Sequence, residues 1–144
     1  MHDVKSKDGT EWFYSNKVKD HFFNPRNILK DGHDVEKYEK EADGIGECGS
    51  AACGDVMRMW IKVKDGKIKD CKWRTFGCAS AIAATSMFSV IVTEKGGMKI
   101  SKALKLKPQE IVERLDGLPT RKFHCSVLAD QAFKSAVEDY KKRG

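Results

Sequence analysis

The chain has 144 residues, a formal net charge of +6 and 40% hydrophobic residues. This length favours one domain, and a domain near this size buries roughly 70% of the surface of its unfolded chain. No apolar run reaches the roughly 18 residues of a membrane span, and the N-terminus lacks the apolar core of a signal peptide. No basic stripe is interleaved with stacking aromatic residues, a pattern that would indicate nucleic-acid binding. We therefore expect a cytoplasmic protein that binds neither membrane nor nucleic acid.

The N-terminal third contains one clear helical pattern. Residues 1–13 are polar and carry no clear period, so we expect a flexible leader there and a single domain over residues 14–144. Apolar residues recur at helical spacing in residues 14–23, and the predicted helix stops before Pro25 because proline disfavours helix for the residue before it. The charged stretch 32–43 is expected to be a surface loop or a frayed turn.

The middle of the chain predicts a β-hairpin. Residues 44–55 are rich in glycine, alanine and serine, and we expect a tight loop that ends at the entrance of a strand. Residues 56–63 and 67–76 alternate as strands do, and Asp65-Gly66 between them is typical of a type I′ turn. Ile68 departs from the alternation, which predicts a bulge or an edge at that point.

The C-terminal half predicts helices. A long helix is expected over about residues 79–93, and the Gly96-Gly97 pair ends it. Two short helices should follow at residues 101–106 and 108–115. The last helix should run from about residue 125 to 141.

The number of cysteines indicates metal binding or thiol chemistry. An odd number of cysteines in a chain without a secretion signal argues against a disulfide framework. No two of them form a Cys-x-x-Cys pair, which argues against a thioredoxin-like enzyme and a zinc ribbon. The five cysteines are Cys48, Cys53, Cys71, Cys78 and Cys125.

Three of these cysteines occupy similar places in the expected fold. Cys53 precedes the first strand, and Cys78 and Cys125 lie where two helices begin, so that the helix dipole and unpaired N–H groups favour their thiolates. Asp55 offers a hard oxygen ligand and His124 a neutral imidazole. Three sulfurs with one of these groups would make a four-coordinate site suited to zinc or iron.

Four segments resemble the U-type iron–sulfur cluster assembly scaffolds, the family of IscU and of the N-terminal domain of NifU. The first two are His21-Phe22-Phe23-Asn24-Pro25-Arg26-Asn27 and Ala52-Cys53-Gly54-Asp55-Val56-Met57. The other two are Thr75-Phe76-Gly77-Cys78-Ala79-Ser80-Ala81-Ile82-Ala83 and His124-Cys125-Ser126-Val127-Leu128-Ala129. They occur in the order that the family has and together are very specific.

The resemblance implies an α+β fold, with a small antiparallel sheet of about three strands packed against several helices. It implies a scaffold, not an enzyme, that assembles a [2Fe–2S] cluster from iron and desulfurase-derived sulfur and transfers it to apo-proteins. Cys53, Cys78 and Cys125 would hold the cluster, with Asp55 or His124 at or near the fourth position. Cys125 would also accept persulfide sulfur, and the apo form would hold zinc at the same site.

The resemblance also implies partners. These are a cysteine desulfurase, a ferredoxin or frataxin-like protein and apo-protein acceptors, bound by a monomer or a cluster-linked dimer. Where the family has a Leu-Pro-Pro-Val-Lys stretch read by an Hsp70-type chaperone, this chain has Leu118-Pro119-Thr120-Arg121-Lys122. The lost proline and the added charge weaken the expectation of chaperone-assisted transfer.

Simpler interpretations of the same residues remain open. The metal could be a structural zinc ion, or the thiols could belong to a sulfur carrier or sulfurtransferase. Asp55 could form a strand-end hydrogen bond and His124 a helix cap. Cys71 is expected to pack in a strand beside Trp73, whereas Cys48 could pack or serve as an auxiliary ligand or sulfur carrier. Arg26 is expected to act as a structural clamp or partner contact.

Overall fold

The computed structural model describes residues 4–5, 11–12, 15–50, 55–76, 78–118 and 124–143. The elements in chain order are β1 (Val4–Lys5), β2 (Glu11–Trp12), α1 (Asn16–Phe23), α2 (Gly32–Glu41), β3 (Gly44–Ser50), β4 (Asp55–Lys64), β5 (Lys67–Thr75), α3 (Ala79–Thr93), η2 (Glu94–Gly96), α4 (Ile100–Ala103), α5 (Pro108–Arg114) and α6 (His124–Arg143). For α1, α3, α5 and α6, the predicted first and last residues lie within about two residues of these bounds. This is the precision expected of helix boundaries.

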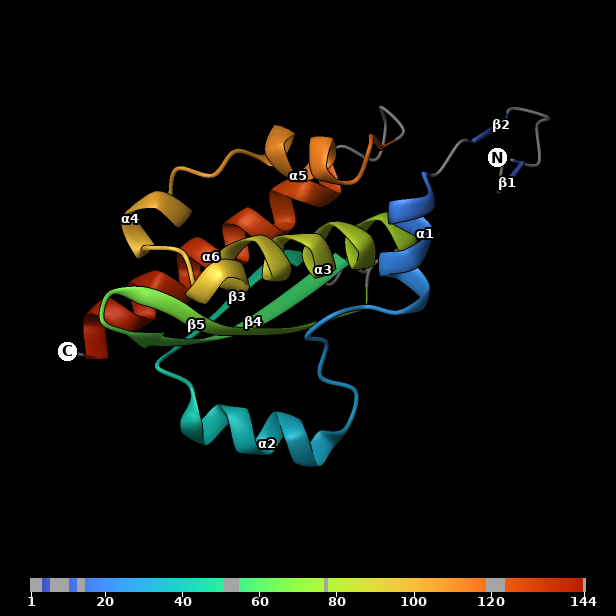
Figure 1. Cartoon of the computed structure of the whole chain (residues 1–144). Helices are drawn as coiled ribbons and strands as arrows, with labels where there is room; N and C mark the ends of the chain where they lie inside the picture. Colours follow the sequence, from blue (N-terminus) through green and yellow to red (C-terminus); the bar gives the residue numbers. More distant parts are fainter. Residues whose placement is uncertain are drawn as a thin grey trace.

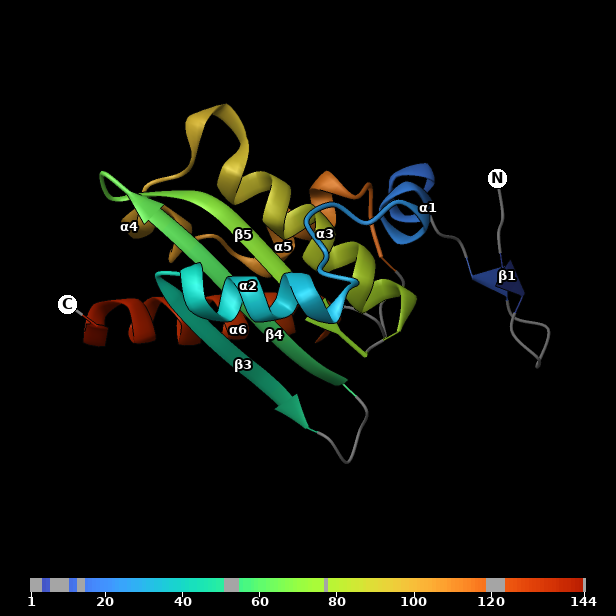
Figure 2. The same ribbon diagram turned by 90° about the horizontal axis from the view of Figure 1, so that it is seen from below.

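A three-stranded antiparallel sheet divides the molecule into layers. The strand order is β3-β4-β5. Helices α3 and α6 lie on one face of the sheet with α4 and α5 beyond them, and α2 crosses the opposite face (Figures 1 and 2). This arrangement confirms the predicted α+β class and the three-stranded sheet.

The β4–β5 hairpin has the predicted turn and the predicted bulge. Asp65 has φ 55° and Gly66 has φ 74°, and positive φ at both central residues is what a type I′ turn requires. The register shifts next to Val63, which pairs with Ile68, whereas Lys62 pairs with Asp70. The extra residue keeps Ile68 on the buried face, where its side chain is fully covered.

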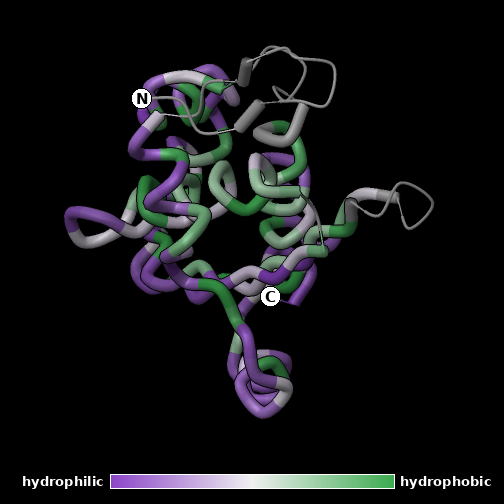
Figure 3. Tube along the Cα trace, turned by 90° about the vertical axis from the view of Figure 1, so that its right-hand side faces the viewer, coloured by the Kyte–Doolittle hydropathy of each residue, from purple (hydrophilic) through white to green (hydrophobic). Residues whose placement is uncertain are grey.

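The main core lies between the sheet and the α3–α6 layer. Alternate residues of β4 point into it, and Met57, Met59 and Ile61 are fully buried. Phe88 of α3 and Phe133 of α6 meet edge to face, with ring centroids 5.2 Å apart. In Figure 3 the hydrophobic segments gather in this body, while the mostly hydrophilic α2 projects from it. Among the described helices, none has the length and hydropathy of a membrane span.

The expectation of a surface loop over residues 32–43 is wrong, because α2 forms there. Asp31 caps the helix by accepting a hydrogen bond from the backbone N–H of His33 at 2.9 Å. Val35, Tyr38 and Ala42 pack with Leu29 and Trp60 in a second, smaller hydrophobic cluster. The helical spacing of Val35, Tyr38 and Ala42 indicates this helix, although many charged residues surround them in the sequence.

Charged side chains fix α2 to the sheet. Glu39 accepts hydrogen bonds from Arg58 Nε at 2.8 Å and from Trp60 Nε1 at 3.2 Å. Tyr38 donates a hydrogen bond of 2.6 Å to Asp70 on β5. Burial, aided by this carboxylate, raises the pKa of Tyr38 well above its ordinary value. The helix is therefore a defined layer of the fold.

The expected loop over residues 44–55 is also wrong in its first half, which forms the edge strand β3. An added Cβ at Gly44 would lie 2.3 Å from the carbonyl oxygen of Ala136. At Gly46 it would lie 2.2 Å from the Ala136 nitrogen and 2.4 Å from the Ala132 oxygen. These glycines therefore allow the backbone of α6 to lie directly against the strand.

The N-terminal segment contains a short ladder. Val4 pairs with Trp12 and Lys5 with Glu11 in an antiparallel arrangement. The division into a leader over residues 1–13 and a domain over residues 14–144 stays a prediction.

Candidate functional site

Three elements that carry predicted site residues begin at the same end of the molecule. Strand β4 begins at Asp55, helix α3 follows Cys78, and helix α6 begins at His124 and Cys125. Figures 1 and 2 show all three starting points at the end where α1 lies. The fold thus brings together positions that are far apart in the sequence.

Contacts along β3 show why the start of α6 lies beside the start of β4. Gly46 lies against Ala132 and Ala136, and Cys48, two residues further, donates an S–H hydrogen bond of 3.0 Å to the carbonyl oxygen of Leu128. Two residues of a strand span about 6.8 Å, and four residues of a helix span about 6 Å. The contacts between β3 and α6 therefore move toward the start of α6 as they move toward the end of β3. The same step places the backbone of Ser50 opposite the first turn of α6. Ser50 pairs with Asp55.

Contacts at the end of β5 place Cys78 at the same end. Thr75, the last residue of β5, pairs with Met57 and donates a 2.8 Å hydrogen bond from Oγ1 to the carbonyl oxygen of Val56. Cys78 comes three residues later as the N-cap of α3 and is half-buried. A thiol there lies in the positive field of the helix N-terminus, which favours its thiolate.

The structure locates four of the five predicted site residues, some by their backbone alone. Cys78 is described with its side chain, whereas Asp55, His124 and Cys125 are placed as the first residues of β4 and α6. Cys53 lies outside the described residues. The assignment of these five residues as ligands stays a prediction.

The other two cysteines are held by packing. Cys71 on β5 is fully buried in the main core, and burial raises the pKa of its thiol. Cys48 continues the stripe of small residues that faces α6, and its thiol is engaged by the Leu128 carbonyl. Burial raises the pKa of Cys48 as well. Both shifts disfavour the thiolate, which is the form that binds metal or attacks sulfur.

A buried histidine, which the sequence analysis did not single out, fixes α1 to α3. His21 Nδ1 lies 2.7 Å from Ser86 Oγ, and that oxygen accepts the backbone N–H of Arg26 at 2.8 Å. Arg26 also binds Asp20 at 2.6 Å, and its carbonyl oxygen accepts the indole N–H of Trp73 at 2.8 Å. The backbone of Arg26 thus joins α1 to α3 and β5, while its side chain is held by Asp20, and its role as a clamp or partner contact stays a prediction.

We expect the stability of the protein to fall when the pH drops below about 6.5, the ordinary pKa of histidine. Burial, with a smaller effect of Arg26, lowers the pKa of His21 in the folded state. The unfolded chain therefore binds the proton more readily, and stability is lost as the pH falls through the lowered value. Arginine partners lower the pKa of Asp20 and of Glu94, so these carboxylates titrate below this window.

Urea unfolding between about pH 7.5 and about pH 5.5 tests this expectation. In a His21→Asn variant, whose amide can take the place of Nδ1, the pH slope should flatten. His33→Asn, a change at an exposed position of α2, is the control and should keep the parent slope. An unchanged slope in His21→Asn would show that another group is responsible.

The geometry defines an α+β protein with a candidate site at the common starting end of β4, α3 and α6. Residues 13–144 match the family NifU-like N terminal domain. The chain belongs to this family.

Curated relatives agree with this assignment, and a solved structure shares the fold. The iron-sulfur cluster assembly scaffold protein IscU 1 of Archaeoglobus fulgidus is 47% identical over 127 residues, which cover 88% of this chain and 76% of that protein. The IscU scaffold protein of Azotobacter vinelandii is 46% identical over 130 residues, 89% of this chain and 94% of that protein. The crystal structure of an N-terminal NifU-like protein from Brucella abortus superposes with a TM-score of 0.64 at 15% identity, covering 90% and 94% of the two chains, and supports the fold.

Proposed function

We propose that this protein is a scaffold on which an iron–sulfur cluster is assembled and from which it is passed to apo-proteins. The observation that carries the proposal is the convergence of Cys78 with the starts of β4 and α6 in a chain of this family. The relatives named above are iron–sulfur cluster assembly scaffolds. The cluster is the cargo of such a protein, and no independent turnover is expected.

Cys53, Cys78 and Cys125 are the proposed ligands of a [2Fe–2S] cluster. Thiolates are the ordinary ligands of such clusters, and two of these three cysteines lie where a helix begins. Asp55 or His124 would complete the site. A carboxylate or imidazole among thiolates leaves one weaker bond, which suits a cluster that has to leave. The apo site would accept zinc, for which sulfur with nitrogen or oxygen ligands is suitable.

Iron and acid-labile sulfide analysis of anaerobically purified protein, with its absorption spectrum, tests the proposal. Equal amounts of iron and sulfide after incubation with desulfurase, cysteine, ferrous iron and a dithiol that reduces persulfide sulfur to sulfide would support it. A structural zinc protein would instead keep its zinc and take up neither element. A sulfurtransferase would transfer sulfur to a small acceptor without retaining iron.

Sulfur from a cysteine desulfurase is expected to arrive on Cys125. Its thiolate would attack the outer sulfur of the donor persulfide, forming a new S–S bond while the donor cysteine leaves as a thiolate, with no net oxidation. Incubated with desulfurase and cysteine but without iron, the protein should carry the persulfide on this one residue. Peptide mass spectrometry after alkylation locates it. Equal labelling of Cys48, in the same protein, would contradict directed transfer.

Replacing Asp55 by alanine is expected to slow cluster transfer several-fold. Without the carboxylate the iron would be held in a more persistent state, as the resemblance to the family implies. The measurement is the half-life of transfer to an apo-ferredoxin, with Asp65→Asn in the hairpin turn as a control for the loss of one charge, because asparagine tolerates the positive φ of this position. A parent-like half-life in Asp55→Ala would remove this residue from the mechanism.

The desulfurase is proposed to dock at the end of the molecule where these elements begin. Among the described residues, the large hydrophobic side chains that are exposed are Phe23, at 71%, and Phe76, at 78%. Phe76 lies two residues before Cys78, and exposed aromatic residues are typical anchors of protein interfaces. A ferredoxin or frataxin-like protein and the apo-protein acceptors are further proposed partners, and the cytoplasm is the proposed location.

A further inference from the structure

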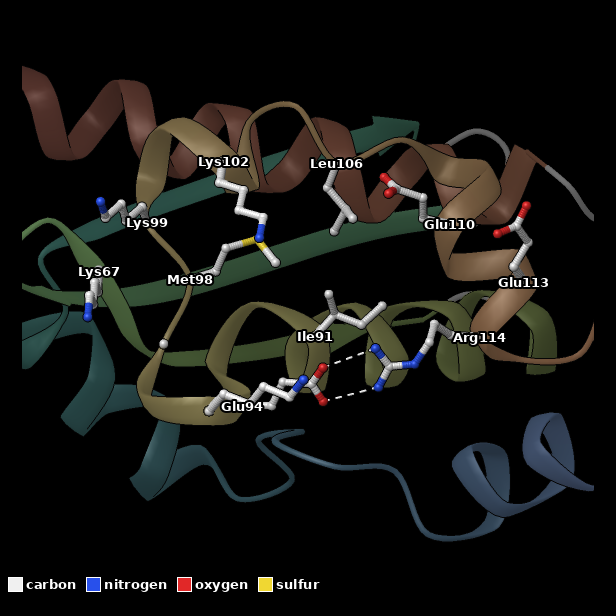
Figure 4. Close-up of a pocket in the computed structure, with 12 residues that line it drawn as sticks. Lys67, Ile91, Glu94, Met98, Lys99, Lys102, Leu106, Glu110, Glu113 and Arg114 are labelled. Carbon is white, nitrogen blue, oxygen red and sulfur yellow. Dashed lines mark hydrogen bonds and ion pairs between the residues drawn. The ribbon is translucent and has the colours of Figure 1, made fainter.

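A groove of about 750 Å³ lies on the helical side of the molecule, between α3, η2, α4 and α5. Its floor contains the apolar side chains of Ile91, Met98 and Leu106 (Figure 4). Helix α3 has 15 residues, so its C-terminal end, where the groove begins, lies about 20 Å from Cys78. This end of the groove is therefore separate from the proposed cluster site.

The two ends of the groove carry opposite charges. Lys67, Lys99 and Lys102 lie at one end, and Glu110 and Glu113 lie at the other (Figure 4). Lys95 adds a fourth ammonium group to the lining.

An ion pair forms part of the wall between these ends. The guanidinium of Arg114 binds both carboxylate oxygens of Glu94, each at 3.0 Å. These two charges compensate each other, so the lysines and the two remaining glutamates set the polarity of the groove.

The fold places two of these lysines directly opposite each other. The segment around Lys99 is joined to the hairpin by hydrogen bonds from Ile68 N to Met98 O at 2.9 Å and from Ile100 N to Gly66 O at 3.0 Å. This makes Lys67 and Lys99 direct partners in an antiparallel bridge, and like charges opposite each other are destabilising. Within the described part of the chain, Lys67, Lys99 and Lys102 have no ion-pair partner, whereas the charge of Lys95 acts on Glu94.

We propose that this groove binds a short peptide segment of a partner protein. The segment would place apolar side chains on the floor, acidic residues against the lysines and a basic residue near Glu110 and Glu113. Nucleic acid fits less well because its uniform negative charge would meet these two glutamates, and a small anion would leave the apolar floor uncovered. Since the lysine end of the groove is remote from Cys78, a partner held at that end could remain bound while a cluster is assembled.

A peptide array of defined composition tests the proposal. Each member carries one lysine, two residues chosen from Leu, Ile, Met and Phe, and three acidic residues in that order, and each is paired with a scrambled peptide of the same composition. Fluorescence anisotropy with the best members should show binding that weakens with added salt. If no member binds better than its scrambled counterpart, the proposal is wrong.

Charge reversal then locates the binding. The double variant Lys99→Glu and Lys102→Glu should lose about tenfold or more in affinity, because two charge contacts become repulsive. The matched control reverses Lys141 and Lys142, two exposed lysines near the end of α6, and should change affinity less than about twofold. A quadruple variant adds Glu110→Lys and Glu113→Lys to this double variant, so that both ends of the groove change sign. A peptide with the opposite charge order should recover binding to the quadruple variant.

Two further measurements exclude the other occupants. Inorganic phosphate or a single-stranded RNA oligonucleotide that bound as tightly as the peptide, with the same dependence on Lys99 and Lys102, would replace the proposal with a general anion site. Equal loss of peptide binding in the tail control would show non-specific attraction to a basic protein. Cluster loading should be unchanged in all groove variants, so this test is independent of the scaffold function.

Discussion

Serine at position 78 is expected to leave less than about a tenth of the cluster that the parent protein holds after anaerobic reconstitution. A hydroxyl is a much poorer ligand than a thiolate for iron that is shared with sulfide. Cys53→Ser and Cys125→Ser should behave in the same way, because each removes one of the three proposed sulfur ligands. The measurement is bound iron and acid-labile sulfide per chain, together with the visible absorption of the cluster.

Cys71→Ala is the matched control for these variants. Cys71 is fully buried in β5 and packs in the main core, so its loss should lower stability but leave the cluster in place. Circular dichroism should show that all four variants are folded. If Cys71→Ala loses as much cluster as Cys78→Ser, the assignment of the ligands is wrong.

Gly46→Ala is expected to lower the free energy of unfolding by about 3 kcal/mol. The added Cβ would lie 2.2 Å from the nitrogen and 2.4 Å from the oxygen of two α6 residues, and backbone atoms cannot move aside as a flexible side chain can. Helix α6 would have to move away from β3. Domains of this kind are stable by roughly 5–15 kcal/mol, so the loss is a large part of the total.

Urea unfolding of Gly46→Ala and of Gly32→Ala measures this effect. Gly32 begins α2, and nothing lies within 4 Å of a Cβ added there. Alanine favours helix over glycine, so Gly32→Ala should change stability by less than about 1 kcal/mol, in the stabilising direction. Similar losses in both variants would show that the close approach of α6 is not what requires glycine at position 46.

Elements with strong local signals could be predicted from the sequence. The β4–β5 hairpin follows from an Asp-Gly pair between two alternating runs, and the long apolar run of α3 follows from its composition and its bounding glycines. The beginnings of α3 and α6 were also predictable. These beginnings place Cys78, His124 and Cys125, so much of the candidate site could be inferred before the fold was known.

The two errors concern information that is not local. In α2 three apolar residues lie among many charges, and the helix is fixed by Trp60 of a distant strand. In β3 the glycines indicated a loop. Glycine is required there because α6, about 90 residues further along the chain, packs directly against the strand. The groove was missed for the same reason, because Lys67 and Lys99 become neighbours only when the chain folds.

Transfer of a labelled cluster to an apo-ferredoxin tests the central claim most directly. The protein is loaded with radioactive iron and radioactive sulfide, mixed with apo-ferredoxin and an excess of an iron chelator, and the two proteins are then separated. If the protein is a scaffold, both labels should move to the ferredoxin in equal amounts, and the chelator should hold little of either. Iron retained by this protein, or iron lost to the chelator while sulfide is released, would contradict the scaffold function.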